Sequence, residues 1–370
     1  MYVIGGFGPG AFGPVGAVEA YNPATNSWTQ KAPMPVPLNN PNGIGVINGK
    51  FFVAGGWKED DASPSGGLRE YTPATDHWRK LGPDPILSGS GAVGVIGGKL
   101  YVFNGTQGGG GRAGQLSRYD PATNTWTSLR RALHDHMRGG GGVIGGKFYV
   151  VGGLDEFTGN KGHFLEVYDP STNWWTGKAP MPTAREDVAS VVLMGKLYVI
   201  GGFKIDPNGI ALGLTATVEV YDPATNTWST GVPMPKPMRA LGAAAVTNSA
   251  GQAVAYVIGG VGCCGLSNQN LLYDPTVPNQ PPVAVANGPY TGTVGQPVQF
   301  SALGSSDPEG AWNGTWSFGD GMSYTGTFGN FSSQNPQHTY TAAGGYPVTF
   351  TVTDANGAAT TASTTATISP

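Results

Sequence analysis

The chain has 370 residues, a formal net charge of −3 and a pI near 5.9, and charged residues make up only 12% of it. This slightly acidic balance argues against nucleic-acid binding through a basic face and against polybasic attachment to a membrane. No run of 18 or more apolar residues is present, so no membrane span is expected. Hydrophobic residues reach 39%, which is enough to build a folded core although Gly and Pro are abundant.

Two landmarks recur six times over residues 1 to about 276. One is a short apolar strand that ends in glycines, as in KLYVIGG (196–202). The other ends in Tyr and a turn, usually followed by Trp, as in VYDPATNTW (220–228). A period near 50 residues with these landmarks indicates the four-stranded blades of a β-propeller. We expect the repeated tryptophans to pack between blades, namely Trp28, Trp78, Trp126, Trp175 and Trp228.

These units resemble the kelch repeat, and the resemblance implies an all-β, six-bladed propeller over residues 1–277. The first copy lacks its first, innermost strand and the last copy lacks its fourth, outermost strand, so about 22 strands are expected. One upstream segment would supply both missing strands and close the ring. We therefore expect the natural protein to begin about 25–30 residues earlier, with an export signal that this chain does not carry.

A Pro-rich linker at 278–282 precedes a different pattern over residues 283–370. The segments SSDPEG (305–310), WSFGDG (316–321) and GYPVTFTVTD (345–354) resemble a PKD domain. The resemblance implies an immunoglobulin-like β-sandwich, mostly extracellular, with Trp316 in its core. It also implies a calcium site in some members, for which the oxygen ligands here would be Asp307, Glu309 and Asp354. The alternative is that these acidic residues are solvated turn-formers.

Arginines precede several innermost strands of the expected propeller. Arg138, Arg185 and Arg239 should therefore lie around the mouth of the central channel, on the face that carries the long links between strands. Together with Glu186, His134 and His136 they would form a ligand-binding group in which the guanidinium groups hold a carboxylate or another anion. The alternative is that they pair with the neighbouring acids Glu186, Asp187 and Asp135 and only solubilise the rim.

The segment His134-Asp135-His136 is the one clustered histidine motif in the sequence, and its spacing can place two imidazoles on one side of a strand. Asp155, Glu156 or His163 could complete a metal site, whereas the alternative is a pair of exposed loop histidines. The two cysteines, Cys263 and Cys264, are adjacent and cannot form a disulfide framework. Their redox state is left open.

Both resemblances favour a secreted or cell-surface protein that binds rather than catalyses. The propeller loops would bind a glycan or protein ligand, and the PKD-like domain would act as a spacer. The alternative is a carbohydrate-active enzyme similar to the kelch-fold N-acetylneuraminate epimerase, that is, a sugar epimerase or mutarotase. A galactose oxidase-like enzyme is less favoured, because the copper site with its Tyr-Cys crosslink has no counterpart here. Apart from calcium in the PKD-like domain, no cofactor is expected.

Overall fold

A computed structural model describes the chain except for residues 9–12, 58–64, 108–112, 156–161, 207–209, 249–250, 264, 269, 279, 308–311, 328–334 and 355–356. Within the described part, no helix is both long and apolar enough to cross a bilayer. The chain divides into two compact units, one of residues 1–229 with 237–274 and one of residues 275–370 with 230–236. The linker expected at 278–282 remains a prediction.

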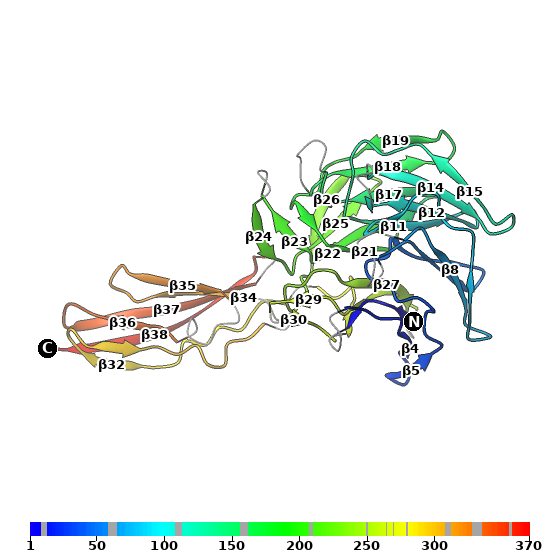
Figure 1. Cartoon of the computed structure of the whole chain (residues 1–370). Helices are drawn as coiled ribbons and strands as arrows, with labels where there is room; N and C mark the ends of the chain where they lie inside the picture. The colour runs from blue at the N-terminus through cyan, green and yellow to red at the C-terminus, as the bar shows by residue number, and fades with distance from the viewer. Residues whose placement is uncertain are drawn as a thin grey trace. The chain divides into compact units, whose positions relative to one another are not determined.

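The described residues of the first unit form six antiparallel sheets that correspond to the expected blades (Figure 1). Blade 1 has three strands: β1 (Tyr2–Ile4), β4 (Val18–Asn22) and β5 (Ser27–Lys31). Blade 2 has β6 (Gly43–Ile47), β7 (Lys50–Ala54), β8 (Leu68–Thr72) and β9 (His77–Lys80). Blade 3 has β11 (Ala92–Ile96), β12 (Lys99–Asn104), β14 (Gln115–Asp120) and β15 (Thr125–Leu129).

The remaining three sheets repeat this pattern. Blade 4 has β16 (Gly140–Ile144), β17 (Lys147–Val151), β18 (Leu165–Asp169) and β19 (Trp174–Gly177). Blade 5 has β21 (Ala189–Leu193), β22 (Lys196–Ile200), β25 (Val218–Asp222) and β26 (Thr227–Gly231). Blade 6 has three strands: β27 (Gly242–Thr247), β28 (Ala253–Ile258) and β31 (Asn270–Tyr273). The first strands of blades 2 to 6 lie side by side in chain order, as innermost strands of a propeller do.

Short additional strands extend the links on one face of the propeller. They are β2 (Phe7–Gly8) with β3 (Gly13–Pro14), β10 (Ser88–Gly89) with β13 (Thr106–Gln107), β20 (Arg185–Glu186) with β23 (Phe203–Ile205) and β24 (Ala211–Leu214), and β29 (Val261–Gly262) with β30 (Gly265–Leu266). The pairs β10–β13 and β20–β23 join the link before a first strand to the link after a second strand. Both kinds of link therefore lie on the same face, as the blade order predicts.

Blades 2 to 5 are each fastened to the preceding blade by two hydrogen bonds to a single residue. In blade 2, Trp78 Nε1 donates to the carbonyl of Ala32 and Asp76 Oδ1 accepts from the Ala32 N–H, both at 2.9 Å. The same two bonds join Trp126 and Asn124 to Gly82, Trp175 and Asn173 to Arg130, and Trp228 and Asn226 to Ala179. These contacts confirm that the four tryptophans pack between blades.

Trp28 does not follow this rule. Its side chain is 42% exposed, and its ring lies 4.8 Å from the ring of Tyr21 in its own blade. The prediction of inter-blade packing is wrong for this residue because the described part of blade 6 has no fourth strand to receive the indole. Blades 1 and 6 do meet through Tyr21 and Tyr256, whose ring centroids are 5.4 Å apart.

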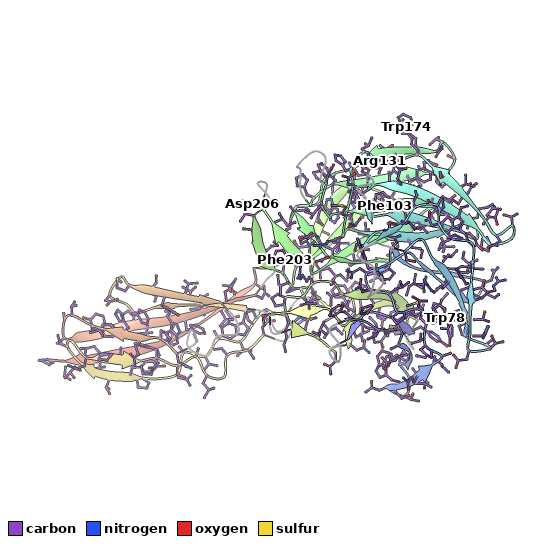
Figure 2. All side chains as sticks on the ribbon, viewed as in Figure 1. Trp78, Phe103, Arg131, Trp174, Phe203 and Asp206 are labelled. Atoms are coloured by element: carbon purple, nitrogen blue, oxygen red, sulfur yellow. The ribbon has the colours of Figure 1, made fainter. Side chains whose placement is uncertain are left out.

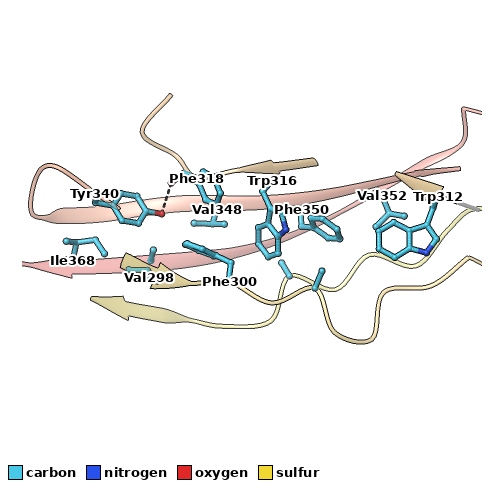
Figure 3. Close-up of a cluster of buried hydrophobic side chains, with 13 residues drawn as sticks. Val298, Phe300, Trp312, Trp316, Phe318, Tyr340, Val348, Phe350, Val352 and Ile368 are labelled. Carbon is cyan, nitrogen blue, oxygen red and sulfur yellow. Dashed lines mark hydrogen bonds between the residues drawn. The ribbon is translucent and has the colours of Figure 1, made fainter. Parts of the chain in front are cut away.

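The second unit contains a five-stranded sheet and a two-stranded sheet. The larger has the order β32 (Tyr290–Thr293), β38 (Ala359–Ser369), β37 (Gly344–Asp354), β34 (Trp312–Ser317) and β35 (Ser323–Thr327). The smaller pairs β33 (Pro297–Gln299) with β36 (Gln337–Thr339). Trp316 is fully buried in the core with Phe300 and Phe350, as the sequence predicted (Figure 3). Tyr340 is also buried there, and its hydroxyl donates to the carbonyl of Phe318 at 3.0 Å.

Candidate functional site

Five equivalent residues, one from each of blades 2 to 6, form an arc at one mouth of the propeller. They are Asn40, Ser90, Arg138, Asp187 and Ala240, and each has a left-handed backbone with φ between 41° and 60°. Each N–H from Ser90 onward donates to the carbonyl of the preceding member, at 2.8–2.9 Å. This bonding offsets the strain that non-glycine residues have in the left-handed region. The arc therefore holds the backbone of these five residues in place at the mouth.

The arc borders a cavity of about 730 Å³ inside the propeller unit. Its walls are largely apolar and include Tyr2, Ile44, Val46 and Tyr256. They come from blades 1, 2 and 6, where β1 is the inner edge of the described three-stranded sheet of blade 1. The volume lies in the range of cavities that bind small molecules. The cavity also borders the free edge of β1, where the sequence predicts the missing innermost strand of blade 1.

Two ion pairs lie at the mouth of this cavity. Arg138 Nη1 is 3.4 Å from Glu186 Oε2, and Arg239 Nη1 is 3.1 Å from Asp187 Oδ2. The arginine side chains are 46% and 36% exposed, so both guanidinium groups also face solvent. Arg239 additionally lies 5.2 Å from the ring centre of Phe203, which Figure 2 labels on β23. Burial raises the pKa of the Glu186 carboxyl, and the charge of Arg138 opposes that shift.

Arg185 lies apart from these pairs, inside blade 5. Its side chain is fully buried, and Nη1 donates to the carbonyls of Gly201 at 2.7 Å and Thr217 at 2.9 Å. Nη2 is 2.6 Å from Glu219 Oε2. The guanidinium therefore joins the second and third strands of its own blade, whereas Arg138 and Arg239 lie at the mouth. These bonds stabilise blade 5. A role for Arg185 in ligand binding stays a prediction.

The two histidines of the clustered motif meet a carboxylate in blade 4. His134 Nδ1 contacts Glu166 Oε1, and His136 Nε2 is 3.7 Å from Glu166 Oε2. The side chain of His136 is fully buried and that of His134 is 23% exposed. Burial acts to raise the pKa of Glu166, but the interactions with the two nearby histidines outweigh it and lower that pKa to about 2. Glu166 is therefore a carboxylate at neutral pH.

Sequence reasoning missed Glu166 as the partner of the two histidines. The signal was present, because Glu166 stands two residues before the repeat tyrosine, at the position that Glu219 occupies in the next copy. Of the partners considered, Asp155 is buried, His163 is half-buried and Glu156 lies outside the described residues. In the part of the chain that the structure describes, His134, His136 and Glu166 form the one group of three with metal-ligating atoms in reach of one another.

The acidic residues of the second unit are placed only in part. Asp307 and Asp354 are both buried, and Asp354 Oδ1 accepts a hydrogen bond from the Ala358 N–H at 2.9 Å. Glu309 lies outside the described residues. The calcium site expected at these three residues stays a prediction. Cys263 is exposed and Cys264 lies outside the described residues, so their redox state also stays open.

Comparisons with known proteins agree with this architecture. The Kelch motif matches residues 1–35, 89–131, 138–182 and 184–235, and the PKD domain matches residues 279–369. A solved structure of YjhT superimposes with a TM-score of 0.60 at 17% identity, covering 73% of this chain and 90% of that one. This likeness shows the propeller fold.

The C-terminal region is similar to parts of two bacterial proteins. Collagenase ColQ1 of Bacillus cereus (strain Q1) is 36% identical over 91 residues, and a microbial collagenase of Vibrio alginolyticus is 38% identical over 94 residues. These matches cover 24% and 25% of this chain but only 9% and 11% of the collagenases. The chain is therefore a kelch-repeat β-propeller protein, with kelch repeats over residues 1–235 and a PKD domain over residues 279–369.

Proposed function

We propose that this chain is an extracellular or cell-surface binding protein whose propeller takes a glycan at the mouth of its cavity. The PKD domain serves as a spacer. The extracellular location is supported by the similarity of the PKD region to segments of two bacterial collagenases. The glycan is supported by the side chains at the mouth of the propeller.

Arg138 and Arg239 pair with Glu186 and Asp187, as the rim alternative expects. The observation that carries the proposal is that both guanidinium groups also stay exposed to solvent beside an apolar cavity. Each guanidinium has five N–H donors in a planar fork, and the ion pairs of Arg138 and Arg239 leave donors that face solvent. Glu186 and Asp187 supply acceptors. Sugar hydroxyls donate and accept at once, so a surface that alternates strong donors and strong acceptors can bind them in several directions.

The mouth has no net charge from these four residues, because two arginines face two carboxylates. Ligand selection there rests on hydrogen-bond geometry more than on long-range attraction. The apolar wall gives the carbon face of a sugar ring a surface to cover, as cavities that bind small molecules do. Phe203 beside Arg239 adds an aromatic face at the same mouth.

A second candidate function is a carbohydrate-active enzyme at the same mouth, and the state of Glu186 favours it. The Glu186 carboxyl is buried, has its pKa raised by that burial, and lies 3.4 Å from Arg138 Nη1. Carboxyl groups with such shifts in a cavity are suited to proton transfer. The binding and catalytic proposals share the ligand class, so one set of experiments can separate them.

The test is a glycan array probed with the untagged full chain, followed by calorimetry on the glycans that bind. The double variant Arg138→Ala with Arg239→Ala should weaken binding at least about tenfold, because two charge-assisted donors are lost. Arg79→Ala is the matched control, since Arg79 is 61% exposed and pairs with Glu70 at 2.9 Å. Equal binding by the wild type and the double variant would contradict the proposal. Conversion of a bound sugar, seen by NMR and lost in Glu186→Gln, would establish the enzymatic alternative.

A further inference from the structure

Blades 4 and 5 hold different side chains at one equivalent buried position. His136 and Arg185 each precede a residue that pairs with the link after the second strand, as Met137 pairs with Leu154 and Glu186 with Phe203. His136 Nδ1 bonds to the carbonyl of Gly152 at 2.9 Å, and Arg185 Nη1 donates to the carbonyl of Gly201 at 2.7 Å. Gly152 and Gly201 are the first glycines of their repeats' Gly-Gly pairs. His136 and Arg185 therefore occupy equivalent positions in blades 4 and 5.

Both blades place a glutamate opposite this position. In blade 5 both positions of the pair bond to the glutamate, whereas in blade 4 only the His134 position does. Glu219 accepts hydrogen bonds from Arg185 Nη2 at 2.6 Å and from the Thr183 hydroxyl at 2.8 Å. In blade 4, His134 stands where Thr183 does and contacts Glu166 Oε1. The Leu133 N–H donates to Glu166 Oε2 at 3.0 Å. His136, which stands at the position of Arg185, lies 3.7 Å from that oxygen and makes no hydrogen bond to it.

His136 Nε2 stands where blade 5 has the guanidinium of Arg185, and it makes no hydrogen bond within the described part of the chain. A carbonyl can only accept, so the bond to Gly152 requires the proton of His136 on Nδ1. In the neutral imidazole Nε2 then presents its lone pair. This atom is fully buried and has no hydrogen-bond partner among the described residues. It faces Glu166 Oε2 across 3.7 Å, beyond the roughly 2.8 Å of a charge-assisted hydrogen bond. Two acceptors that face each other in a buried site favour a cation between them.

We propose that His134, His136 and Glu166 bind one divalent transition-metal ion of the zinc class. Two imidazoles and a carboxylate are a ligand set that such ions use. Ligands around tetrahedral zinc lie about 3.3–3.4 Å apart, given bonds of about 2.1 Å. The ligand atoms here lie within 4.8 Å of one another, so a contraction of about 1.5 Å or less at the widest pair closes the site.

The surroundings of the three ligands suit a metal ion. The bond from His136 Nδ1 to a backbone carbonyl is the arrangement that orients metal-binding histidines. The ring of His134 stacks on Phe164 with centroids 3.6 Å apart, which fixes its plane. Because His134 is partly exposed, water can reach the site and occupy a further coordination position. The ion would take the place that the guanidinium of Arg185 has in blade 5.

The test is zinc titration of the untagged full chain, treated with a chelator and then dialysed, by isothermal calorimetry. One zinc ion per chain should bind, and His134→Ala should weaken that binding about 100-fold or more. His136→Arg rebuilds the blade 5 pair and should abolish binding while circular dichroism and the melting temperature stay at wild-type values. His163→Ala is the matched control, because this half-buried neighbour of Phe164 is outside the group and its loss should leave the affinity unchanged.

Three results would overturn the proposal. They are the absence of zinc binding to the wild type at millimolar zinc, unchanged binding by His134→Ala, and unchanged binding by a folded His136→Arg. If His136→Arg does not fold, Glu166→Gln and anomalous diffraction at the zinc edge of wild-type crystals decide the matter. A peak between the three side chains supports the site, and a peak elsewhere refutes it.

Discussion

Asp84→Asn tests how the buried polar network of blade 3 depends on pH. Asp84 Oδ1 accepts from the Ile86 N–H at 2.9 Å and from the Ser117 hydroxyl at 3.1 Å. Oδ2 is buried without a hydrogen-bond partner among the described residues. Burial raises the pKa of this carboxyl from 3.8 to about 6, and the hydrogen bonds offset only part of that shift. The folded chain therefore holds the proton of Asp84 more tightly than the unfolded chain does.

The sign of the effect follows from this difference. Protonation of Asp84 stabilises the fold fully below about pH 3.8, and that contribution is lost as the pH rises through about 6. A shift of about two pH units corresponds to about 3 kcal/mol. Because asparagine does not titrate, the free energy of unfolding of the wild type should fall by about 2.5 kcal/mol relative to Asp84→Asn between pH 4 and pH 8.

The assay is urea unfolding of both proteins at five pH values, followed by tryptophan fluorescence. At pH 4 the protonated carboxyl has one O–H donor, whereas the amide has two N–H donors at a site where Oδ2 has no hydrogen-bond partner among the described residues. The variant should therefore be the less stable protein at pH 4. The difference in the free energy of unfolding between the wild type and Asp84→Asn should vanish or change sign by pH 8. Glu19→Gln, which removes an exposed carboxylate, should give no such trend. A difference between wild type and Asp84→Asn that is constant with pH would refute the reasoning.

Three further predictions concern packing. Asn226→Ala should lower the free energy of unfolding by about 3 kcal/mol, because it removes two hydrogen bonds and places alanine at a φ of 56°. Asn226→Gly should lower it by about 1 kcal/mol less, because glycine adopts that φ without strain. Equal losses in thermal unfolding would contradict the contribution assigned to the left-handed backbone. Trp175→Phe should cost about 1–3 kcal/mol because the carbonyl of Arg130 loses its donor, and Trp28→Phe should cost less than about 0.5 kcal/mol. Trp316→Ala should destabilise the PKD domain by about 3–5 kcal/mol in the same assay, and a loss below about 1 kcal/mol would show that this core is not as closely packed as described.

Most of the fold was predictable because the repeat fixes it. The Gly-Gly and Tyr landmarks place a strand before and after each link, so even the incomplete first and last sheets were predicted. Trp28 was the exception, because its sequence is that of the other copies while its surroundings depend on a strand that the described part of blade 6 lacks. The sequence around a residue does not tell whether the strand that it would pack against is present.

The candidate site was predictable only by position along the chain. Arg138 and Arg239 were expected at the mouth, and their exposed ion pairs lie there. Arg185 looked equivalent to them but stands at the position of His136, which is buried in the blade. A shift of one residue along a strand turns a side chain from one face to the other, so the distinction needs the register that the structure supplies.

The most direct test of the central claim is a crystal structure of the chain with the glycan that binds most tightly on the array. The account predicts density for the sugar in the cavity, with its hydroxyl or carboxylate oxygens within about 3 Å of Arg138 and Arg239. Density for the sugar on the PKD domain, or on the outer strands of the blades with the mouth left to solvent, would contradict it.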